Sequence, residues 1–210
     1  MPKFSTDWFD HVIFNFEHCR ANLPETKSIL EIGCYEGRAT CWMLQNMLDD
    51  RGEITVIDPF GHTHVNPFNN EQTIDGYSTL EIFKSNTAEV KKPRQKIKIM
   101  QGTSYERLAE LIVAKKRFDF IYVDGNHCAD AALTDACMCF GLLRDGGIML
   151  FDDYLWEEPA DHLIRCKASI DAFVNLFRKQ LDMMVMNYQW GIRKKSVLIN
   201  PMLAMRSNAG

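Results

Sequence analysis

The sequence predicts an α/β fold, namely a Rossmann-like doubly wound sheet of seven strands that is mostly parallel and ends in a C-terminal antiparallel β-hairpin. From residue 28 onward, short apolar runs of strand length alternate with segments in which apolar side chains recur at helical spacing. Such alternation produces right-handed βαβ crossovers and a parallel sheet covered on both faces. Near the end of the chain, two β-like runs follow each other with no helical pattern between them, which favours antiparallel pairing.

Five short apolar runs predict the parallel strands, which are Ser28–Gly33, Ile54–Asp58, Ile97–Met100, Phe118–Asp124 and Ile148–Phe151. Helical spacing of apolar residues predicts the helices that alternate with them, at residues 38–48, 77–90, 105–114, 129–143 and 163–177. The hairpin is expected to pair Asp182–Gln189 with Ser196–Asn200 through a short link that contains Gly191.

The chain is expected to form a single domain over residues 1–210. Its 210 residues are 46% hydrophobic, which is enough to bury a full core without disulfides or a structural metal. Residues 1–27 are expected to be an N-terminal helical segment, because Trp8, Val12 and Phe16 recur at helical spacing. Residues 59–76 are interpreted as a polar, lid-like loop, and residues 201–210 as a tail.

Charge and composition exclude several kinds of partner. Lysine and arginine number 24 and aspartate and glutamate 28, so the net charge is −4 and no nucleic-acid-binding face is expected. No apolar run approaches the roughly 20 residues of a membrane span, so no membrane partner is expected. The seven cysteines form no CxxC pair and the first residues lack a signal-peptide core, which favours reduced thiols and a cytoplasmic location. A homodimer is left open.

A glycine-containing turn follows the first predicted strand. The pattern is ExGxxxG, with Gly33 and Gly37, and glycine there lets the backbone approach a ligand closely. Asp58 ends the second strand 25 residues after Gly33, where a carboxylate can accept both hydroxyls of a ribose. Glu36 would repel a pyrophosphate, so a nucleoside is favoured over a dinucleotide. The alternative is that these residues form only a turn and a strand end.

Three carboxylates follow two further strands. Asp124 ends the fourth strand, and Asp152 and Asp153 follow the fifth. Neighbouring parallel strands lie about 4.8 Å apart, so these side chains are expected to meet at one edge of the sheet. Clustered anions repel one another, and a hard divalent cation such as Mg²⁺ or Mn²⁺ relieves that repulsion. The alternative is that the aspartates only cap the structure that follows them.

With these motifs in place, the chain resembles the class I S-adenosylmethionine-dependent methyltransferases. The motifs that carry the resemblance are LEIGCYEG, ITVIDPF and QGTSYERL, together with the terminal hairpin. The segment VDGNHCADAALTDACMCFGLLRDGGIMLFDDY is similar to metal-dependent O-methyltransferases of the macrocin type, which act on sugars. That resemblance implies that Asp124, Asp152 and Asp153 hold Mg²⁺ and that His127 acts as the catalytic base beside Asp124.

The same resemblance implies the contacts to S-adenosylmethionine. Gly33 and Gly37 would flank its methionine part and Asp58 would bind its ribose. Thr103 stands where the family typically has an acidic residue near the adenine, and Ser104 is the better candidate for a polar contact there. The full set of expected cofactor-binding residues is Glu31, Gly33, Tyr35, Gly37, Asp58, Pro59, Thr103, Ser104 and Asp124.

The function expected from the resemblance is Mg²⁺-dependent methylation of a hydroxyl on a sugar, a glycan or a similar small molecule. Two alternatives are kept. One is a metal-independent small-molecule methyltransferase in which the acidic cluster is structural. The other is a non-catalytic domain that binds S-adenosylmethionine and presents a surface to a partner.

Overall fold

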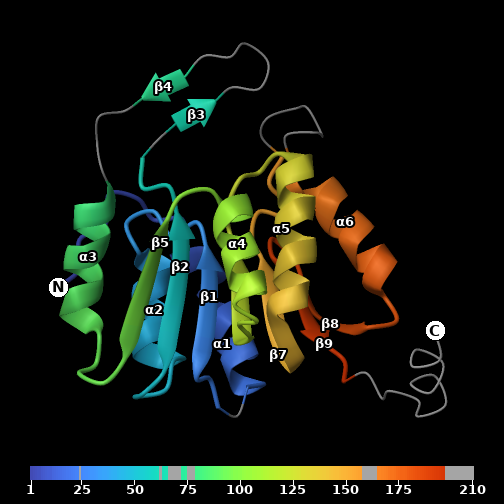
Figure 1. Ribbon diagram of the computed structural model, residues 1–210, viewed down its shortest axis with the longest axis horizontal. Helices are drawn as coiled ribbons and strands as arrows, with labels where there is room; N and C mark the ends of the chain where they lie inside the picture. Colours follow the sequence, from blue (N-terminus) through green and yellow to red (C-terminus); the bar gives the residue numbers. More distant parts are fainter. Residues whose placement is uncertain (24, 62, 66–71, 75–78, 158–164, 197–210) are drawn as a thin grey trace.

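The computed structural model describes residues 1–23, 25–61, 63–65, 72–74, 79–157 and 165–196. In these residues a seven-stranded sheet has the order β5-β2-β1-β6-β7-β9-β8 (Figure 1). Its parallel strands are β1 (Ser28–Ile32), β2 (Glu53–Asp58), β5 (Lys96–Gln101), β6 (Phe118–Val123) and β7 (Leu143–Phe151). The predicted fold class is confirmed.

The strand order reverses at the centre of the sheet. β1 pairs with β2 on one side and with β6 on the other, although β6 comes much later in the chain. In doubly wound sheets such a reversal leaves a crevice at the carboxyl ends of the strands, and ligands bind there. The register places Ile32 opposite Val123, and Val123 opposite Phe151. The residues that follow these three strands therefore meet at one edge of the sheet.

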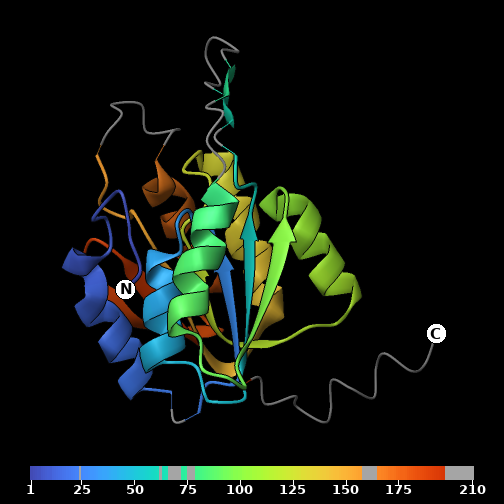
Figure 2. The same cartoon turned by 90° about the vertical axis from the view of Figure 1, so that its left-hand side faces the viewer.

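Helices cover both faces of the sheet (Figure 2). One face carries η1 (Asp10–Val12), α1 (Ile13–Ala21), α2 (Arg38–Asn46) and α3 (Thr79–Val90), and the other carries α4 (Ser104–Val113), α5 (Ala129–Leu142) and α6 (Cys166–Phe177). A buried apolar cluster lies on each face, with Phe16 in one and Phe173 in the other. Among the described residues, no helix is long and apolar enough to cross a membrane.

Part of the segment expected to be an irregular loop has regular structure. Within residues 59–76, β3 (Thr63–Val65) and β4 (Gln72–Ile74) pair antiparallel beyond the carboxyl ends of the main sheet (Figure 1). The predicted loop therefore contains two short strands, and its lid-like role stays a prediction. Residues 66–71 and 75–76 of that segment, and the 201–210 tail, lie outside the described residues.

The C-terminal hairpin is confirmed, but the sequence misplaces its second strand. β8 (Leu181–Met186) pairs with β9 (Trp190–Lys194), so Gly191 lies inside a strand and not in the link. Gly191 stands between Leu150 and Val185, and a Cβ built on it would lie 3.2 Å from the Val185 Cβ. Glycine is therefore needed for close packing within the sheet rather than for a turn. Of the predicted Ser196–Asn200 strand, residues 197–200 lie outside the described part of the chain.

Candidate active site

The loop after β1 packs directly against the end of β6. Gly33 has a φ of 76°, and a Cβ built on it would lie 1.8 Å from the backbone oxygen of Asp124. Glycine is the residue that tolerates both this conformation and this contact. The close packing brings the predicted cofactor loop next to the strand end that carries the first predicted metal ligand. Gly37, with a φ of 84°, is the N-cap residue of α2.

Asp58 holds this loop against the end of β2. Its Oδ2 accepts hydrogen bonds from the backbone N–H groups of Cys34 at 2.8 Å and Tyr35 at 3.0 Å. Its Oδ1 accepts one from the N–H of Phe60 at 2.6 Å. Tyr35 and Phe60 have positive φ angles of 47° and 52°, a strained conformation that is common at functional sites. A carboxylate has about four acceptor positions, so Asp58 retains capacity for a ligand hydroxyl.

Glu31 is fully buried beneath the same loop. Its Oε2 accepts a hydrogen bond from the Thr40 hydroxyl, while its Oε1 has no partner among the described residues. Burial raises the pKa of the Glu31 carboxyl to about 8, because the Thr40 hydrogen bond offsets it only in part and the nearby Asp58 charge adds to it. Glu31 therefore keeps its proton at pH values where an exposed glutamate has lost it.

This burial predicts a pH-dependent stability. Between pH 4.5, the ordinary pKa, and pH 8, the folded chain binds a Glu31 proton that the unfolded chain releases, so stability falls as pH rises through this window. Glu31→Gln removes the titration and keeps an oxygen for Thr40. From pH 5 to pH 8, wild type should lose on the order of 3–4 kcal/mol relative to the variant, at about 1.4 kcal/mol per pKa unit. Urea denaturation of both proteins measures this, and parallel pH profiles would contradict it.

The other expected cofactor residues follow β2 and β5, which are neighbours in the sheet with Asp58 opposite Gln101. Gln101 Nε2 donates to the carbonyl oxygen of Pro59 at 3.1 Å. Thr103 is the N-cap of α4: its hydroxyl oxygen accepts from the N–H of Glu106 at 3.4 Å. The Thr103 hydroxyl is thus engaged in capping. Burial raises the pKa of the Asp135 carboxyl on α5 to about 6, and the nearby hydroxyl of Ser104 offsets this only in part.

The N-terminal segment packs on the cofactor loop, which the sequence did not indicate. The backbone N–H of Ser5 donates to Glu36 Oε2 at 2.6 Å, and Glu36 is buried. The Trp8 ring lies against the Tyr35 ring, with centroids 5.6 Å apart. The Glu36 carboxylate, which the sequence placed beside a ligand, is therefore bonded to the chain's own N-terminal segment.

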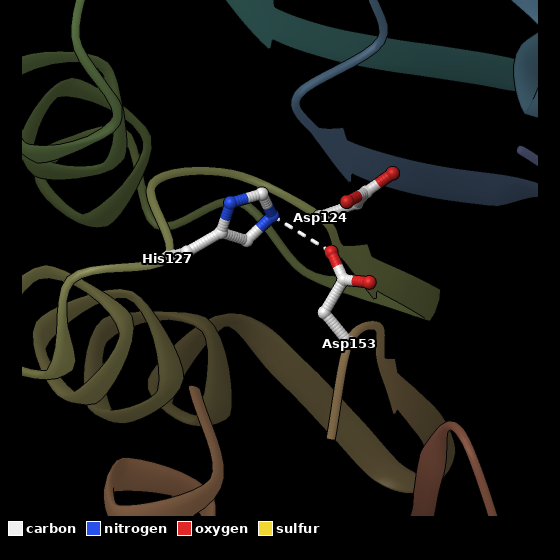
Figure 3. Close-up of side chains that lie close together, drawn as sticks. All are labelled: Asp124, His127 and Asp153. Atoms are coloured by element: carbon white, nitrogen blue, oxygen red, sulfur yellow. Dashed lines mark ion pairs between the residues drawn. The ribbon is translucent and has the colours of Figure 1, made fainter. Parts of the chain in front are cut away.

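Three chemically reactive side chains meet at the ends of β6 and β7. Asp124, His127 and Asp153 each offer one ligand atom, and these atoms all lie within 4.8 Å of one another. His127 points from the β6–α5 loop toward Asp153, with Nε2 2.7 Å from the Asp153 Oδ2 (Figure 3). Asp153 has a positive φ of 55°. The backbone is thus held in a strained conformation where the carboxylate faces the imidazole.

Asp152, the third predicted metal ligand, is bonded away from this cluster. The hydroxyl of Tyr122 donates to the Asp152 Oδ2 and lies 3.2 Å from the Asp124 Oδ2. Gln189 Nε2 donates to the Asp152 Oδ1 at 3.1 Å. Burial raises the pKa of Tyr122 well above its usual value, and the neighbouring carboxylates raise it further. The hydroxyl therefore keeps its proton and remains a hydrogen-bond donor.

The electrostatics of the cluster fit a divalent cation. Burial raises the pKa of Asp124 well above its usual value, and the charges of Asp152 and Asp153 raise it further. Burial would also raise the pKa of Asp153, but His127 and Tyr188 more than offset it, so that pKa is lowered. Carboxylate oxygens are the ligands that Mg²⁺ and Mn²⁺ prefer, and a cation would compensate the charges that otherwise repel. Among the described residues, no other group of this kind is present.

The sequence missed the residues that hold these carboxylates. Tyr122, Tyr188 and Gln189 all donate to aspartates of the site, Tyr188 through its hydroxyl to Asp153 Oδ1 at 2.9 Å. Of these three residues, only Tyr122 could have been found from the sequence. It stands two residues before Asp124 and therefore lies on the same side of the strand. The turn at residues 187–189 reaches the site through the antiparallel pairing of β9 with β7.

A doubly wound sheet of this order, with a glycine turn, a strand-end aspartate and an acidic edge, defines the class I methyltransferase architecture. Residues 30–154 match the family described as "Methyltransferase domain", and the chain belongs to this family. The protein is a methyltransferase by family, which confirms the predicted enzyme class. No curated protein matches the chain significantly.

Solved structures share the fold at low sequence identity. An O-methyltransferase from Bacillus cereus, in complex with S-adenosylhomocysteine, has a TM-score of 0.64 and 16% identity over 91% of this chain and 84% of its own. TomG from Streptomyces achromogenes, in complex with S-adenosylmethionine, has a TM-score of 0.59 and 18% identity over 86% and 78%. MycE of mycinamycin biosynthesis, with Mg, S-adenosylhomocysteine and mycinamycin VI, has a TM-score of 0.60 and 15% identity over 93% of this chain and 52% of MycE. The fold is therefore that of S-adenosylmethionine-dependent O-methyltransferases.

Proposed function

We propose that the protein transfers a methyl group from S-adenosylmethionine to a hydroxyl of a sugar, a glycan or a similar small molecule, with Mg²⁺ or Mn²⁺ bound at the acidic cluster. The observation that carries the proposal is the meeting of Asp124, His127 and Asp153 beside the loop that Asp58 and Gly33 position. A nucleoside site and an acid–base group at one sheet edge are what methyl transfer to a hydroxyl requires.

Each residue has a definite task in this proposal. Asp58 accepts a hydrogen bond from a ribose hydroxyl, and the loop from Gly33 to Gly37 encloses the methionine part. Asp124 and Asp153 hold the cation, with Asp152 behind them. Bound there, a divalent cation supplies Lewis acidity that makes a nearby hydroxyl more acidic. The His127 imidazole takes the hydroxyl proton, the oxygen forms a bond to the methyl carbon, and the carbon–sulfur bond breaks to give S-adenosylhomocysteine.

A sugar-like acceptor is supported by the surroundings of His127. The Trp156 ring lies beside the His127 ring, with centroids 4.9 Å apart, and it is only partly buried. An indole face can pack against an apolar face of a sugar or an aromatic ring. The structure of the fold neighbour MycE contains Mg, S-adenosylhomocysteine and mycinamycin VI, which supports a small-molecule acceptor beside a cation.

Two measurements test the proposal. Calorimetry should show binding of S-adenosylhomocysteine and none of NAD, and Asp58→Ala should weaken that binding by about 1.5–3 kcal/mol, since hydrogen bonds to a charged group are lost. Labelled methyl should pass from S-adenosylmethionine to a pooled set of sugars and catechols when Mg²⁺ is present. Unchanged affinity in Asp58→Ala would remove the ribose assignment.

The proposal also covers location and assembly. A cytoplasmic location is supported by seven cysteines that are all free thiols, five of them buried. A homodimer is supported by exposed apolar side chains of α1 and the edge strand β8, namely Phe14, Met183 and Met186. Sedimentation equilibrium distinguishes a dimer from a monomer.

A further inference from the structure

The carboxylate of Asp152 is fixed on every side by hydrogen-bond donors. Its Oδ1 accepts from the N–H of Asp153 at 2.9 Å and from Gln189 Nε2 at 3.1 Å, and its Oδ2 accepts from the Tyr122 hydroxyl. Asp152 is nine-tenths buried, and Gln189 and Tyr122 are almost wholly inaccessible to solvent. Its orientation beside Asp124 and Asp153 is therefore set by these donors and not by water.

The amide of Gln189 is itself held by α1. Gln189 Oε1 accepts from Asn15 Nδ2 at 2.9 Å, and Asn15 Nδ2 also donates to Asn187 Oδ1 at 2.9 Å. Asn187 Nδ2 returns a hydrogen bond to Asn15 Oδ1 at 2.9 Å. We call these three side chains, Asn15, Asn187 and Gln189, the amide chain.

The direction of the hydrogen bonds along the amide chain is determined at both of its ends. At one end the backbone N–H of Gln189 donates to Asn187 Oδ1 at 3.0 Å, and a backbone N–H can only donate. At the other end the Asp152 Oδ1 already accepts from the backbone N–H of Asp153, so it is an acceptor for Gln189 as well. Reversing any one amide would place oxygen against oxygen and nitrogen against nitrogen. The Gln189 Nε2 donor is thereby directed at Asp152.

We infer that Gln189 is a positioning residue for the cation site and that Asn15, which touches none of the aspartates, acts on the site through Gln189. The inference rests on the cation binding of the proposed function. Both residues lie outside the segment 30–154 that matches the methyltransferase family. The N-terminal helix and the C-terminal hairpin therefore contribute to the affinity of the acidic cluster for a divalent cation.

The test measures Mn²⁺ affinity by titration calorimetry, S-adenosylhomocysteine affinity and thermal stability on the whole chain. Gln189→Met keeps the length of the side chain but removes the donor to Asp152. Loss of a hydrogen bond to a metal ligand typically weakens metal affinity by about 10- to 100-fold. Because Asp152 stands behind the ligands Asp124 and Asp153, we expect a loss at the lower end of that range, about 10-fold. S-adenosylhomocysteine affinity should remain that of wild type.

Asn15→Asp provides the second variant. It replaces the donor to Gln189 with an acceptor, so Gln189 must turn its Nε2 away from Asp152, and Mn²⁺ affinity should fall although no aspartate contact is altered. Asn22→Asp is the matched control, because Asn22 caps the same helix and bonds only the exposed His18 carbonyl through its side chain. The Asn15→Asp and Gln189→Met double variant should bind Mn²⁺ no more weakly than Gln189→Met alone, because Gln189→Met has already removed the link between the amide chain and Asp152.

The outcomes separate this inference from the proposed function. Wild-type Mn²⁺ affinity in Gln189→Met would overturn the inference. So would a parallel loss of Mn²⁺ and S-adenosylhomocysteine affinity in both variants, because the amide chain would then serve stability alone. A wild-type chain that binds S-adenosylhomocysteine but no Mn²⁺ would instead overturn the cation part of the proposed function.

Discussion

Asp153→Asn is expected to lower methyl transfer by about 10³-fold or more while leaving S-adenosylhomocysteine binding intact. A Lewis-acidic cation is worth several kcal/mol in the transition state, and each 1.4 kcal/mol corresponds to a factor of ten. Asp153 supplies one of the charges that would hold the cation and also faces His127 at 2.7 Å. The predicted ribose ligand, Asp58, is the last residue of a different strand, β2, so cofactor binding should not depend on Asp153.

Asparagine is chosen to replace Asp153 because of the backbone conformation at this position. Asp153 has a φ of 55°, which asparagine adopts far more readily than alanine, so the variant removes the charge without adding strain. Asp182→Asn is the matched control: Asp182 is exposed on the edge strand β8 and ion-paired with Lys195 at 2.8 Å. Initial rates with Mg²⁺, before and after chelation, measure the effect. Full activity in chelated wild type would favour the metal-independent alternative.

The parallel core of the fold could be predicted because local pattern and topology agree there. Runs such as Ser28–Ile32 and Phe118–Val123 are mostly apolar and almost wholly buried, as expected of strands covered on both faces, and helical patterns separate them. The hairpin was harder to predict, because Gly191 is a turn signal in the sequence. In the sheet the same glycine instead allows close packing against neighbouring strands. Local rules cannot distinguish these two roles, since Gly191 is enclosed by Val185 on the neighbouring strand β8 and by Leu150 on β7, 41 residues earlier.

The same limit applies to the candidate site. Asp124 and Asp153 could be placed together because both follow neighbouring parallel strands, and His127 is three residues after Asp124. The donors that orient the aspartates could not be found in this way. Gln189 and Asn15 are uncharged, carry no motif and are 174 residues apart, yet they meet at 2.9 Å. Sequence reasoning therefore found the groups expected to react and missed the groups that hold them in place.

His127 can act either as the base or as a ligand of the cation, and a single replacement separates the two roles. As the base, His127 contributes about 10²–10⁴-fold to turnover, so His127→Gln should lower kcat by that factor. Glutamine is neutral and can keep a nitrogen near the position of Nε2, 2.7 Å from Asp153. Mn²⁺ and S-adenosylhomocysteine affinities should then remain those of wild type.

If His127 were instead a ligand, Mn²⁺ affinity would fall together with turnover, and excess Mn²⁺ would restore the rate. His18→Gln, an exposed histidine on α1, controls for the substitution itself. We expect the base role, because Asp124 and Asp153 already supply oxygen donors of the kind that Mg²⁺ prefers, whereas no other described histidine or cysteine side chain joins them in the cluster to take a proton. The imidazole is also the group that the Trp156 ring flanks, on the side where an acceptor could pack. Wild-type turnover in His127→Gln would place the base elsewhere.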